Sequence, residues 1–418
     1  MPDAPNRTRR RLLLLGLAGT SATAAGVFGF EHWRKRHAAA GPDRAPFLSP
    51  TGMLTQRRRL GRTGLEIGVV GIGAGDLDGT GPIHRAVAKG INYLDTSCCY
   101  GRGSSETLVG RAIKETPSLR DQLVLATKWD ASARMPKATI LASLDESLKR
   151  MNTDHVEIMQ IHALGDKFPG DDGFARLDNP ELYAAMDEAK QSGKVRFFGA
   201  TGHVGNRSAI LSHAIDKGFD MILVKMNVLD YETAGIPQLL AHAKEKDVGV
   251  VVMKSQPQGG MMPPGFESSK WNIYQANLRW CLSKDIACVV HSGVGTDEKV
   301  QDAAIGAVHD EVTWNDGADD PALLRRYADA LSPHYCRTCA DAACVDECPE
   351  AIAIPSVLRA FMYDKHYGWP EQALETYGAL PEGERWSERC ASCSACTDAC
   401  PYGVDAAGRV RSARASLG

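Results

Sequence analysis

Four residues have the types and the spacing that acid–base chemistry on a carbonyl group would need. Asp95 and Tyr100 lie just after one short apolar run, and Lys128 and His162 each end a later run. A lysine beside a tyrosine lowers the pKa of the phenol, and an aspartate paired with that lysine holds it charged. The phenol can then protonate a carbonyl oxygen as hydride reaches the carbon, while the histidine hydrogen-bonds the same oxygen.

Each of these residues also has an ordinary structural interpretation. Asp95 could be a strand-end acid, Lys128 a surface lysine, and His162 a hydrogen-bonded core histidine. Together, however, they mark the ends of three consecutive apolar runs. If those runs are neighbouring parallel strands, their ends meet at one rim. We therefore predict that Asp95, Tyr100, Lys128 and His162 form one catalytic group.

Eight of the twelve cysteines lie in the C-terminal tail, in two runs that each end in Cys-Pro. The runs are Cys336-x2-Cys339-x4-Cys344-x3-Cys348 and Cys390-x2-Cys393-x2-Cys396-x3-Cys400. The second has the spacing of bacterial ferredoxins, so the tail predicts two [4Fe–4S] clusters. Because the fourth cysteine of such a run commonly ligates the other cluster, we expect Cys400 to join the first three cysteines and Cys348 to join the second three. Two structural Zn(Cys)4 sites are the alternative, which the Cys-Pro endings and the lack of histidine disfavour.

Cys98 and Cys99 stand apart from that tail, between Asp95 and Tyr100. They could be a redox or metal-binding pair. Adjacent cysteines form strained disulfides, and the pair lacks the C-x-x-C spacing. We therefore interpret both as small residues that pack the loop, as free cysteines often do.

Short apolar runs alternate with amphipathic segments from Leu60 onward. The predicted strands are Ile67–Gly73, Asn92–Thr96, Leu123–Lys128, Val156–His162, Arg196–Thr201, Met221–Asn227, Val248–Lys254 and Ala287–Ser292. The predicted helices are Pro82–Lys89, Ser104–Glu115, Lys137–Arg150, Pro180–Ser192, Ser208–Lys217, Ile236–Lys246 and Tyr274–Ser283. Eight strand–helix units predict an α/β fold, a (β/α)8 TIM barrel, with a small, mainly helical C-terminal iron–sulfur module. An open doubly wound sheet is the alternative, but no G-x-G-x-x-G follows the first strand. We expect an export signal and linker at 1–50, the barrel at 54–318 and the ferredoxin-like domain at 319–418.

The first fifty residues have the pattern of an export signal. Arg9-Arg10-Arg11 precedes an apolar run from Leu12 to Phe30, and Ala38-Ala39-Ala40 offers a cleavage site. Paired arginines before such a run predict export by the twin-arginine route to the periplasm or another extracytoplasmic space. That route carries folded proteins, which suits clusters assembled in the cytoplasm. A plain membrane anchor is the alternative, and we expect membrane contact only through this segment if it stays uncleaved. The net charge of −3 gives no reason to expect a nucleic acid partner.

The chain resembles the aldo-keto reductases over roughly residues 54–310. The matching stretches are Arg59–Ile67, Asp95-Thr96-Ser97 with Tyr100-Gly101 and Ser105-Glu106, Thr127-Lys128, Gln160-Ile161-His162 and Lys194–Gly199. The resemblance implies a (β/α)8 barrel, NADPH-dependent carbonyl reduction and the catalytic tetrad Asp95, Tyr100, Lys128 and His162. The tail resembles helical ferredoxin modules, which occur on some relatives of this family.

The resemblance also assigns residues to a nicotinamide cofactor, either NADP or NAD. Thr201 and His203 stand where the family has a Ser-Asn pair for the carboxamide, and Leu223 stands where it has a glutamine. Ser255, after the seventh strand, is assigned to the cofactor as well. After the eighth strand, backbone N–H groups of a glycine-containing turn could hold a phosphate. The residues assigned there are Ser292, Gly293, Gly295 and Lys299.

These features predict an exported oxidoreductase that acts on a small carbonyl or alcohol, with clusters for electron transfer and a possible redox partner protein. Hydride carries two electrons at once, whereas a cluster carries one. Two alternatives therefore stay open. In one, the barrel is catalytically vestigial and the protein transfers electrons or binds a partner. In the other, the clusters are structural and the barrel works alone.

Overall fold

The computed structural model describes residues 53–165, 172–203, 205–233, 235–268, 270–308, 320–339 and 341–418. The predicted export signal lies outside these residues. Within them, none of the helices combines the length and the apolar character needed to cross a membrane.

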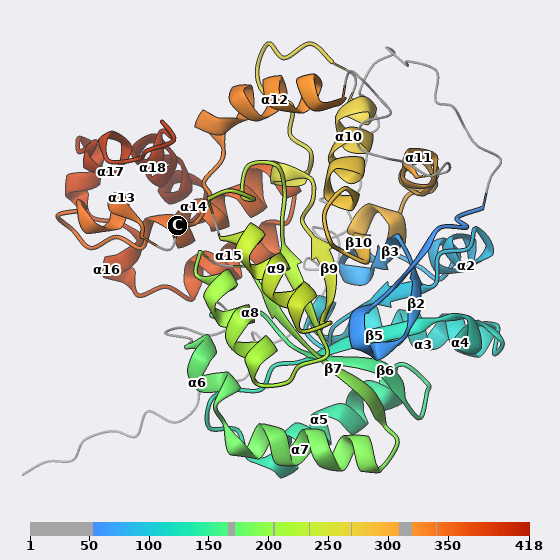
Figure 1. Cartoon of the computed structure of the whole chain (residues 1–418). Helices are drawn as coiled ribbons and strands as arrows, with labels where there is room; N and C mark the ends of the chain where they lie inside the picture. Colours follow the sequence, from blue (N-terminus) through green and yellow to red (C-terminus); the bar gives the residue numbers. More distant parts are fainter. Residues whose placement is uncertain are drawn as a thin grey trace, which may run out of the picture. The chain divides into compact units, whose positions relative to one another are not determined.

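Eight parallel strands close into a barrel, in the order β10-β3-β4-β5-β6-β7-β8-β9 (Figure 1). Most of their residues are buried on both faces, because side chains fill the barrel interior on one side and helices cover the other. The predicted TIM barrel is therefore confirmed. The strands are β3 Val70–Gly73, β4 Tyr93–Asp95, β5 Val124–Trp129, β6 Val156–Ile161, β7 Val195–Gly202, β8 Met221–Lys225, β9 Gly249–Met253 and β10 Cys288–His291.

The helices around the barrel follow the predicted amphipathic segments closely. Two short helices, α4 and α6, were not predicted, and α11 was expected only as a helix that follows the glycine-containing turn, without bounds. Pro at the first turn begins α7, and its N-cap Asn179 accepts a hydrogen bond from Glu181 N. The helices are α2 Gly81–Ala88, α3 Ser104–Glu115, α4 Leu119–Gln122, α5 Lys137–Arg150, α6 Gly173–Leu177, α7 Pro180–Gln191, α8 Arg207–Asp216, α9 Ile236–Glu245, α10 Lys270–Leu282, α11 Glu298–Ala307 and α12 Asp320–Leu331.

A hairpin closes the N-terminal end of the barrel. Its strands are β1 Arg57–Arg59 and β2 Glu66–Gly68, which pair antiparallel. The predicted strand Ile67–Gly73 was therefore wrong in its first half, since the chain ends β2 at Gly68 and begins the barrel strand β3 at Val70. Leu60 and Ile67 of this hairpin are fully buried in the core inside the barrel. Gly61 has φ +49, and a Cβ there would lie 2.3 Å from Gly249 N, so only glycine fits this close approach.

The C-terminal module has a small core of its own, built from residues between Ile352 and Leu417. Its elements are α13 Ala343–Asp346, α14 Ile354–Met362, the π-helical turn Tyr363–Tyr367, α15 Pro370–Gly378, α16 Glu382–Arg385, α17 Ala395–Asp398 and α18 Ala406–Leu417. Helix α12, which the sequence placed with this module, instead packs on the barrel: Leu324, Tyr327 and Leu331 belong to the barrel's core.

One buried carboxylate joins the module to the barrel. Asp230 is fully buried after β8, with Lys225 Nζ 3.1 Å and Arg207 Nη2 3.5 Å from its Oδ2. The hydroxyl of Tyr335, from the start of the module, donates to the same oxygen at 2.9 Å. Asn227 Nδ2 in turn donates to the Tyr335 hydroxyl at 3.0 Å. The first cysteine of the module, Cys336, follows directly, so this contact holds the cysteine tail against the C-terminal ends of the barrel strands.

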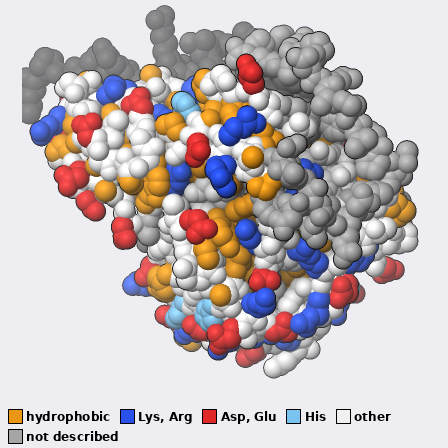
Figure 2. Space-filling view, turned by 45° about the horizontal axis from the view of Figure 1, so that its top comes forward, with side chains coloured by type: hydrophobic (Ala, Val, Ile, Leu, Met, Phe, Trp, Pro, Cys, Tyr) orange, Lys and Arg blue, Asp and Glu red, His pale blue; other side chains and the backbone are white. Residues whose placement is uncertain are grey.

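Charges of both signs are interspersed on the face that Figure 2 displays, with apolar side chains between them. This mixture accords with the near-balance of 48 basic and 51 acidic residues in the chain.

Candidate active site

A buried ion pair occupies the end of the barrel where β4 and β5 finish. Lys128 Nζ lies 2.5 Å from Asp95 Oδ2 and donates to Thr96 O at 2.6 Å. Gln160 Nε2 donates to the other carboxylate oxygen, Asp95 Oδ1, at 2.7 Å. Asp95 is 3% exposed and Lys128 is 1% exposed, so this pair is shielded from water. Burial is the largest single effect on the pKa of Lys128 and lowers it. Asp95 and Tyr100 together raise the pKa by more, so the net pKa is raised and the lysine stays charged.

Tyr100 lies over this pair. It begins the turn Tyr100–Gly103, and its ring centroid is 4.7 Å from Lys128 Nζ. Burial raises the pKa of Tyr100 to about 12, while Lys128 lowers it only in part. The expected lowering of the phenol pKa by Lys128 is present, but burial outweighs it, so the pKa is raised overall. A phenol with this pKa keeps its proton through the neutral range and can act as an acid.

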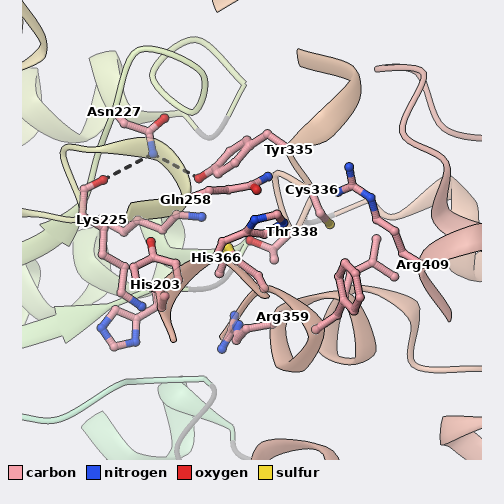
Figure 3. Close-up of a pocket in the computed structure, with 15 residues that line it drawn as sticks. His203, Lys225, Asn227, Gln258, Tyr335, Cys336, Thr338, Arg359, His366 and Arg409 are labelled. Atoms are coloured by element: carbon pink, nitrogen blue, oxygen red, sulfur yellow. Dashed lines mark hydrogen bonds between the residues drawn. The ribbon is translucent and has the colours of Figure 1, made fainter. Parts of the chain in front are cut away.

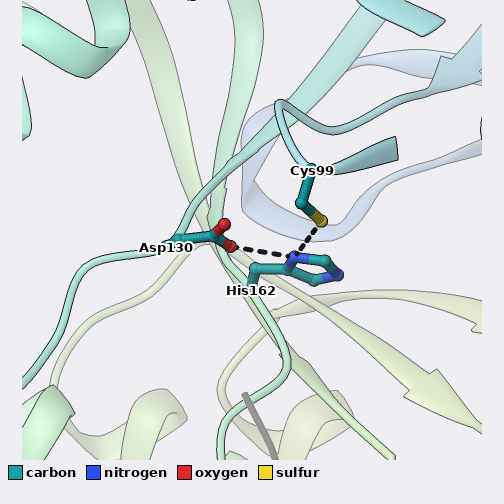
Figure 4. A group of neighbouring side chains, drawn as sticks. All are labelled: Cys99, Asp130 and His162. Atoms are coloured by element: carbon teal, nitrogen blue, oxygen red, sulfur yellow. Dashed lines mark hydrogen bonds and ion pairs between the residues drawn. The ribbon is translucent and has the colours of Figure 1, made fainter. Parts of the chain in front are cut away.

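His162 completes the group from the end of β6. Its ring is edge-on to that of Tyr100, with the centroids 5.9 Å apart. Its Nδ1 lies 3.1 Å from Asp130 Oδ1 and 3.2 Å from Cys99 Sγ (Figure 4). Burial is the largest effect and lowers the pKa of His162, but the hydrogen bonds that the protonated ring donates to Asp130 and Cys99 raise it above the usual value. The structure thus brings all four predicted catalytic residues together at one rim.

Three contacts in this group were missed from the sequence. Gln160 and Asp130 each lie two residues from a predicted catalytic residue, His162 and Lys128 respectively. Alternate residues of a strand share a face, so period-two alternation was the available signal. Cys99 was interpreted as a packing residue, yet its sulfur faces the catalytic histidine.

Buried side chains hold the loops that carry the group. Arg176, 1% exposed, donates to His162 O at 2.9 Å and to Ala131 O at 2.7 Å, which fixes the backbone after β5 and β6. Ala163, directly after His162, has φ +48, a strained conformation for a residue with a Cβ. Glu106, fully buried in α3, accepts hydrogen bonds from Thr127 at 2.6 Å and from an arginine of α5 at 2.7 Å. The Tyr100 loop is thereby anchored at the helix that follows it.

The residues assigned to the nicotinamide end of a cofactor lie at the ends of β7, β8 and β9. Thr201 is fully buried and its hydroxyl accepts a hydrogen bond from Ala163 N at 2.6 Å. Leu223 faces the apolar core inside the barrel. Ser255 is 1% exposed, and its hydroxyl has no hydrogen-bond partner among the described residues. An unpaired buried hydroxyl is costly unless a ligand satisfies it, so Ser255 fits a cofactor amide.

The predicted phosphate turn uses several of its amides internally. It forms a 3-10 turn over Ser292–Gly295, followed by α11. Gly293 N donates to His291 Nδ1 at 3.1 Å, and Asp297 N donates to Gly293 O at 2.8 Å. Lys299 N donates to the side chain of Asp297, the N-cap of α11, at 2.8 Å. The expected cradle of backbone amides therefore lacks these three groups, and the cap itself carries negative charge.

A basic pocket lies where the module meets the barrel (Figure 3). The barrel contributes His203, Lys225 and Lys254, which follow or end β7, β8 and β9. The module contributes Arg359 and Arg409, among others, and the cysteine Cys336. Burial lowers the pKa of Lys225 to about 8 against the pull of Asp230. His203 also faces the catalytic histidine, since its ring centroid is 6.3 Å from that of His162. The pocket thus adjoins both the first cysteine run and the catalytic group.

The eight tail cysteines form two groups in space, and none is in a disulfide. The first run's Cys336, Cys339 and Cys344 each interact electrostatically with Cys400 of the second run. Cys390 and Cys396 interact likewise with Cys348. The cysteines of this second group, Cys348, Cys390, Cys393 and Cys396, line one pocket. Two sets of four thiols, each drawing one member from the other run, fit the donor set of two [4Fe–4S] clusters.

Comparison with protein-family models finds two matches. Residues 80–302 match the aldo/keto reductase family. Residues 335–404 match a 4Fe-4S dicluster domain.

Individual proteins are similar over the barrel. L-Galactose dehydrogenase from Arabidopsis thaliana is 30% identical over 253 residues, which cover 56% of this chain and 74% of that protein. 6-Dehydroglucose reductase from Novosphingobium aromaticivorans is 30% identical over 175 residues, which cover 37% of this chain and 54% of that protein. Among solved structures, an aldo-keto reductase from Bacillus halodurans superposes with a TM-score of 0.50 at 23% identity, over 68% of this chain and 98% of that one. The last similarity shows a shared fold.

Proposed function

The chain belongs to the aldo/keto reductase family and is an oxidoreductase, and we propose that it interconverts a small carbonyl compound and its alcohol with a nicotinamide cofactor. The observation that carries this proposal is the buried group in which Asp95 holds Lys128 charged beneath the protonated phenol of Tyr100. Such a group gives a proton to an oxygen that gains negative charge.

The residues act in a defined order during carbonyl reduction. Thr201, His203 and Ser255 would hold a nicotinamide, which would supply hydride to the carbonyl carbon. Tyr100 gives its proton to the carbonyl oxygen, and the charged Lys128 stabilises the phenolate that is left. His162 hydrogen-bonds the same oxygen and orients the substrate, as its ring lies edge-on to Tyr100. Asp95 and Gln160 keep the lysine in place throughout. In alcohol oxidation the same proton returns to Tyr100.

The 4Fe-4S dicluster domain supplies one-electron transfer when its clusters are bound. We propose two clusters, held by the two groups of four cysteines described above. Support for communication with the barrel comes from the basic pocket, which Cys336 and the strand-end residues His203 and Lys225 line together. A redox partner protein would exchange electrons with the clusters.

The substrate class and the location are also proposals. Two of the similar proteins are named for sugars, galactose and a dehydroglucose, so hydroxylated carbonyl compounds are the first substrates to screen. Support for export comes from the arginines and the apolar run of the first thirty residues.

The test is a pair of tyrosine variants in the full chain with clusters intact. Tyr100→Phe removes the proton donor, so we expect reduction of a reactive aldehyde by NADH or NADPH to fall by about 10²–10⁴-fold. Tyr93→Phe is the matched control, because Tyr93 lies on β4 two residues before Asp95 and its hydroxyl has no hydrogen-bond partner among the described residues. We expect the control to keep full activity. Equal activity in Tyr100→Phe and the parent protein would refute the proposal.

Removal of the clusters separates the two roles proposed for the tail. If the clusters transfer electrons, substituting Cys396 should abolish activity with a one-electron dye while reduction by nicotinamide continues. If the clusters are only structural, the dye should give no turnover even in the parent protein.

A further inference from the structure

We propose that Cys99, Asp130 and His162 form a binding site for one Zn²⁺ ion behind the catalytic histidine. The three side chains come from the ends of β4, β5 and β6, and each offers one ligand atom. These atoms, a sulfur, a carboxylate oxygen and an imidazole nitrogen, all lie within 4.8 Å of one another (Figure 4). Zinc accepts this mixture of sulfur, nitrogen and oxygen, and three protein ligands with one open position are typical of catalytic zinc. The proposal goes beyond the function proposed above, since zinc binding at this site does not depend on which substrate the barrel reduces.

The distances match those that zinc would impose. Two ligands on tetrahedral zinc stand about 3.5 Å apart for sulfur and nitrogen, and about 3.3 Å apart for nitrogen and oxygen, given the usual bond lengths. The observed values are 3.2 Å from Cys99 Sγ to His162 Nδ1 and 3.1 Å from Asp130 Oδ1 to the same nitrogen. A small rotation of the Cys99 or Asp130 side chain would complete the triangle. Both residues are half-buried, so they are not sealed from solvent.

The arrangement differs from a nucleophile triad. In a triad, the cysteine and the acid contact opposite nitrogens of the histidine, so that the ring can relay a proton. Here Cys99 and Asp130 both face Nδ1, and the other ring nitrogen points away from them (Figure 4). One nitrogen carries at most one hydrogen, so it can donate to Asp130 or accept from the thiol, but not both. A cation at this point would contact all three ligand atoms at once.

Zinc at Nδ1 is compatible with the role of His162 in reduction. A metal on Nδ1 places the ring hydrogen on Nε2, the nitrogen free to donate to a carbonyl oxygen. Asp130 and Cys99 would then position the histidine through the ion. His162 itself stays the catalytic residue.

The experiment measures metal in the full chain with both clusters assembled. After incubation with zinc and gel filtration, we expect about one zinc per chain beyond the cluster iron. Zinc K-edge absorption should show one sulfur at about 2.3 Å with nitrogen and oxygen ligands. Cys99→Ala and Asp130→Ala should each weaken zinc binding at least tenfold. Cys98→Ala is the control for a neighbouring thiol. Its Sγ lies 3.8 Å from Asp130 Oδ2 and 3.4 Å from Lys128 O, but Cys98 is outside the three-residue group, so the variant should keep the zinc.

Three results would overturn the proposal. The first is no zinc retained by the parent protein. The second is zinc bound by sulfur alone, which would place an adventitious ion in vacant cluster sites. The third is zinc retained equally by the Cys99→Ala and Cys98→Ala variants. Circular dichroism and cluster absorbance identify a variant that fails to fold, and Asp130→Asn, which keeps the size of the side chain, then replaces it in the comparison.

Discussion

Tyr335→Phe should loosen the iron–sulfur module from the barrel. The hydroxyl of Tyr335 donates to the buried carboxylate of Asp230 at 2.9 Å and accepts from Asn227 Nδ2 at 3.0 Å. A hydrogen bond to a buried charged group contributes about 1.5–3 kcal/mol. Asn227 Nδ2 keeps a second contact, 3.1 Å to Asp230, so it is not left unpaired. We therefore expect a loss of about 2–3 kcal/mol in the free energy of unfolding.

The assay is urea unfolding of the full chain with clusters bound, followed by cluster absorbance and by circular dichroism. Tyr377→Phe is the matched control, because Tyr377 is a buried tyrosine of the module whose hydroxyl has no partner among the described residues. Its removal should change the free energy by less than about 0.5 kcal/mol. The Tyr335→Phe midpoint should fall well below that of the control. Equal midpoints would refute the reasoning that the Asp230 network holds the module in place.

Three further predictions concern the barrel. Lys128→Met leaves the charge of the buried Asp95 unpaired, so it should abolish activity and lower the free energy of unfolding by about 3–5 kcal/mol. The double variant with Asp95→Asn should regain most of that stability in urea unfolding but no activity. Burial lowers the pKa of His291 to about 4. As pH falls below about 6.5, the unfolded chain therefore takes up a proton at this residue while the folded chain does not. From pH 7 to pH 5, the free energy of unfolding of the parent protein should fall by about 2 kcal/mol more than that of His291→Asn. An equal loss in both would contradict this. Asp297 and Glu298 place negative charge at the start of α11, so the protein should favour NADH over NADPH. Glu298→Lys should change the ratio of the KM values for the two cofactors about fivefold in favour of NADPH, or about 1 kcal/mol. An unchanged ratio would place the 2′-phosphate site elsewhere.

The barrel could be predicted because its strands are short apolar runs and its helices have clear periodicity. The catalytic group followed from position alone, since parallel strands end on one side and Asp95, Lys128 and His162 end three neighbours. The hairpin was missed for a related reason. Its strand β2 and the barrel strand β3 form one apolar run, and nothing in the composition of that run marks the bend at Val69 that separates them.

Other features depend on contacts that spacing does not contain. The pKa of Tyr100 depends on how deeply its ring is buried, and the extent of that burial is set by the folded barrel and not by the spacing of residues. Cys99 and His162 are 63 positions apart in the sequence, and they meet because of the path of the loop after β4. The internal hydrogen bonds of the Ser292–Lys299 turn arise from its particular backbone path, which the glycines permit but do not dictate.

The hairpin of β1 and β2 has a practical consequence for handling this protein. It places the first described residues at the closed end of the barrel, where Leu54 N bonds to Lys89 O ahead of β4. Helix α18 instead ends within the module, which meets the opposite end of the strands. Immobilisation through the hairpin itself would turn the catalytic rim away from the support. A linker after α18 would bring the cysteine module close to the support, which is the better geometry for wiring the protein to an electrode.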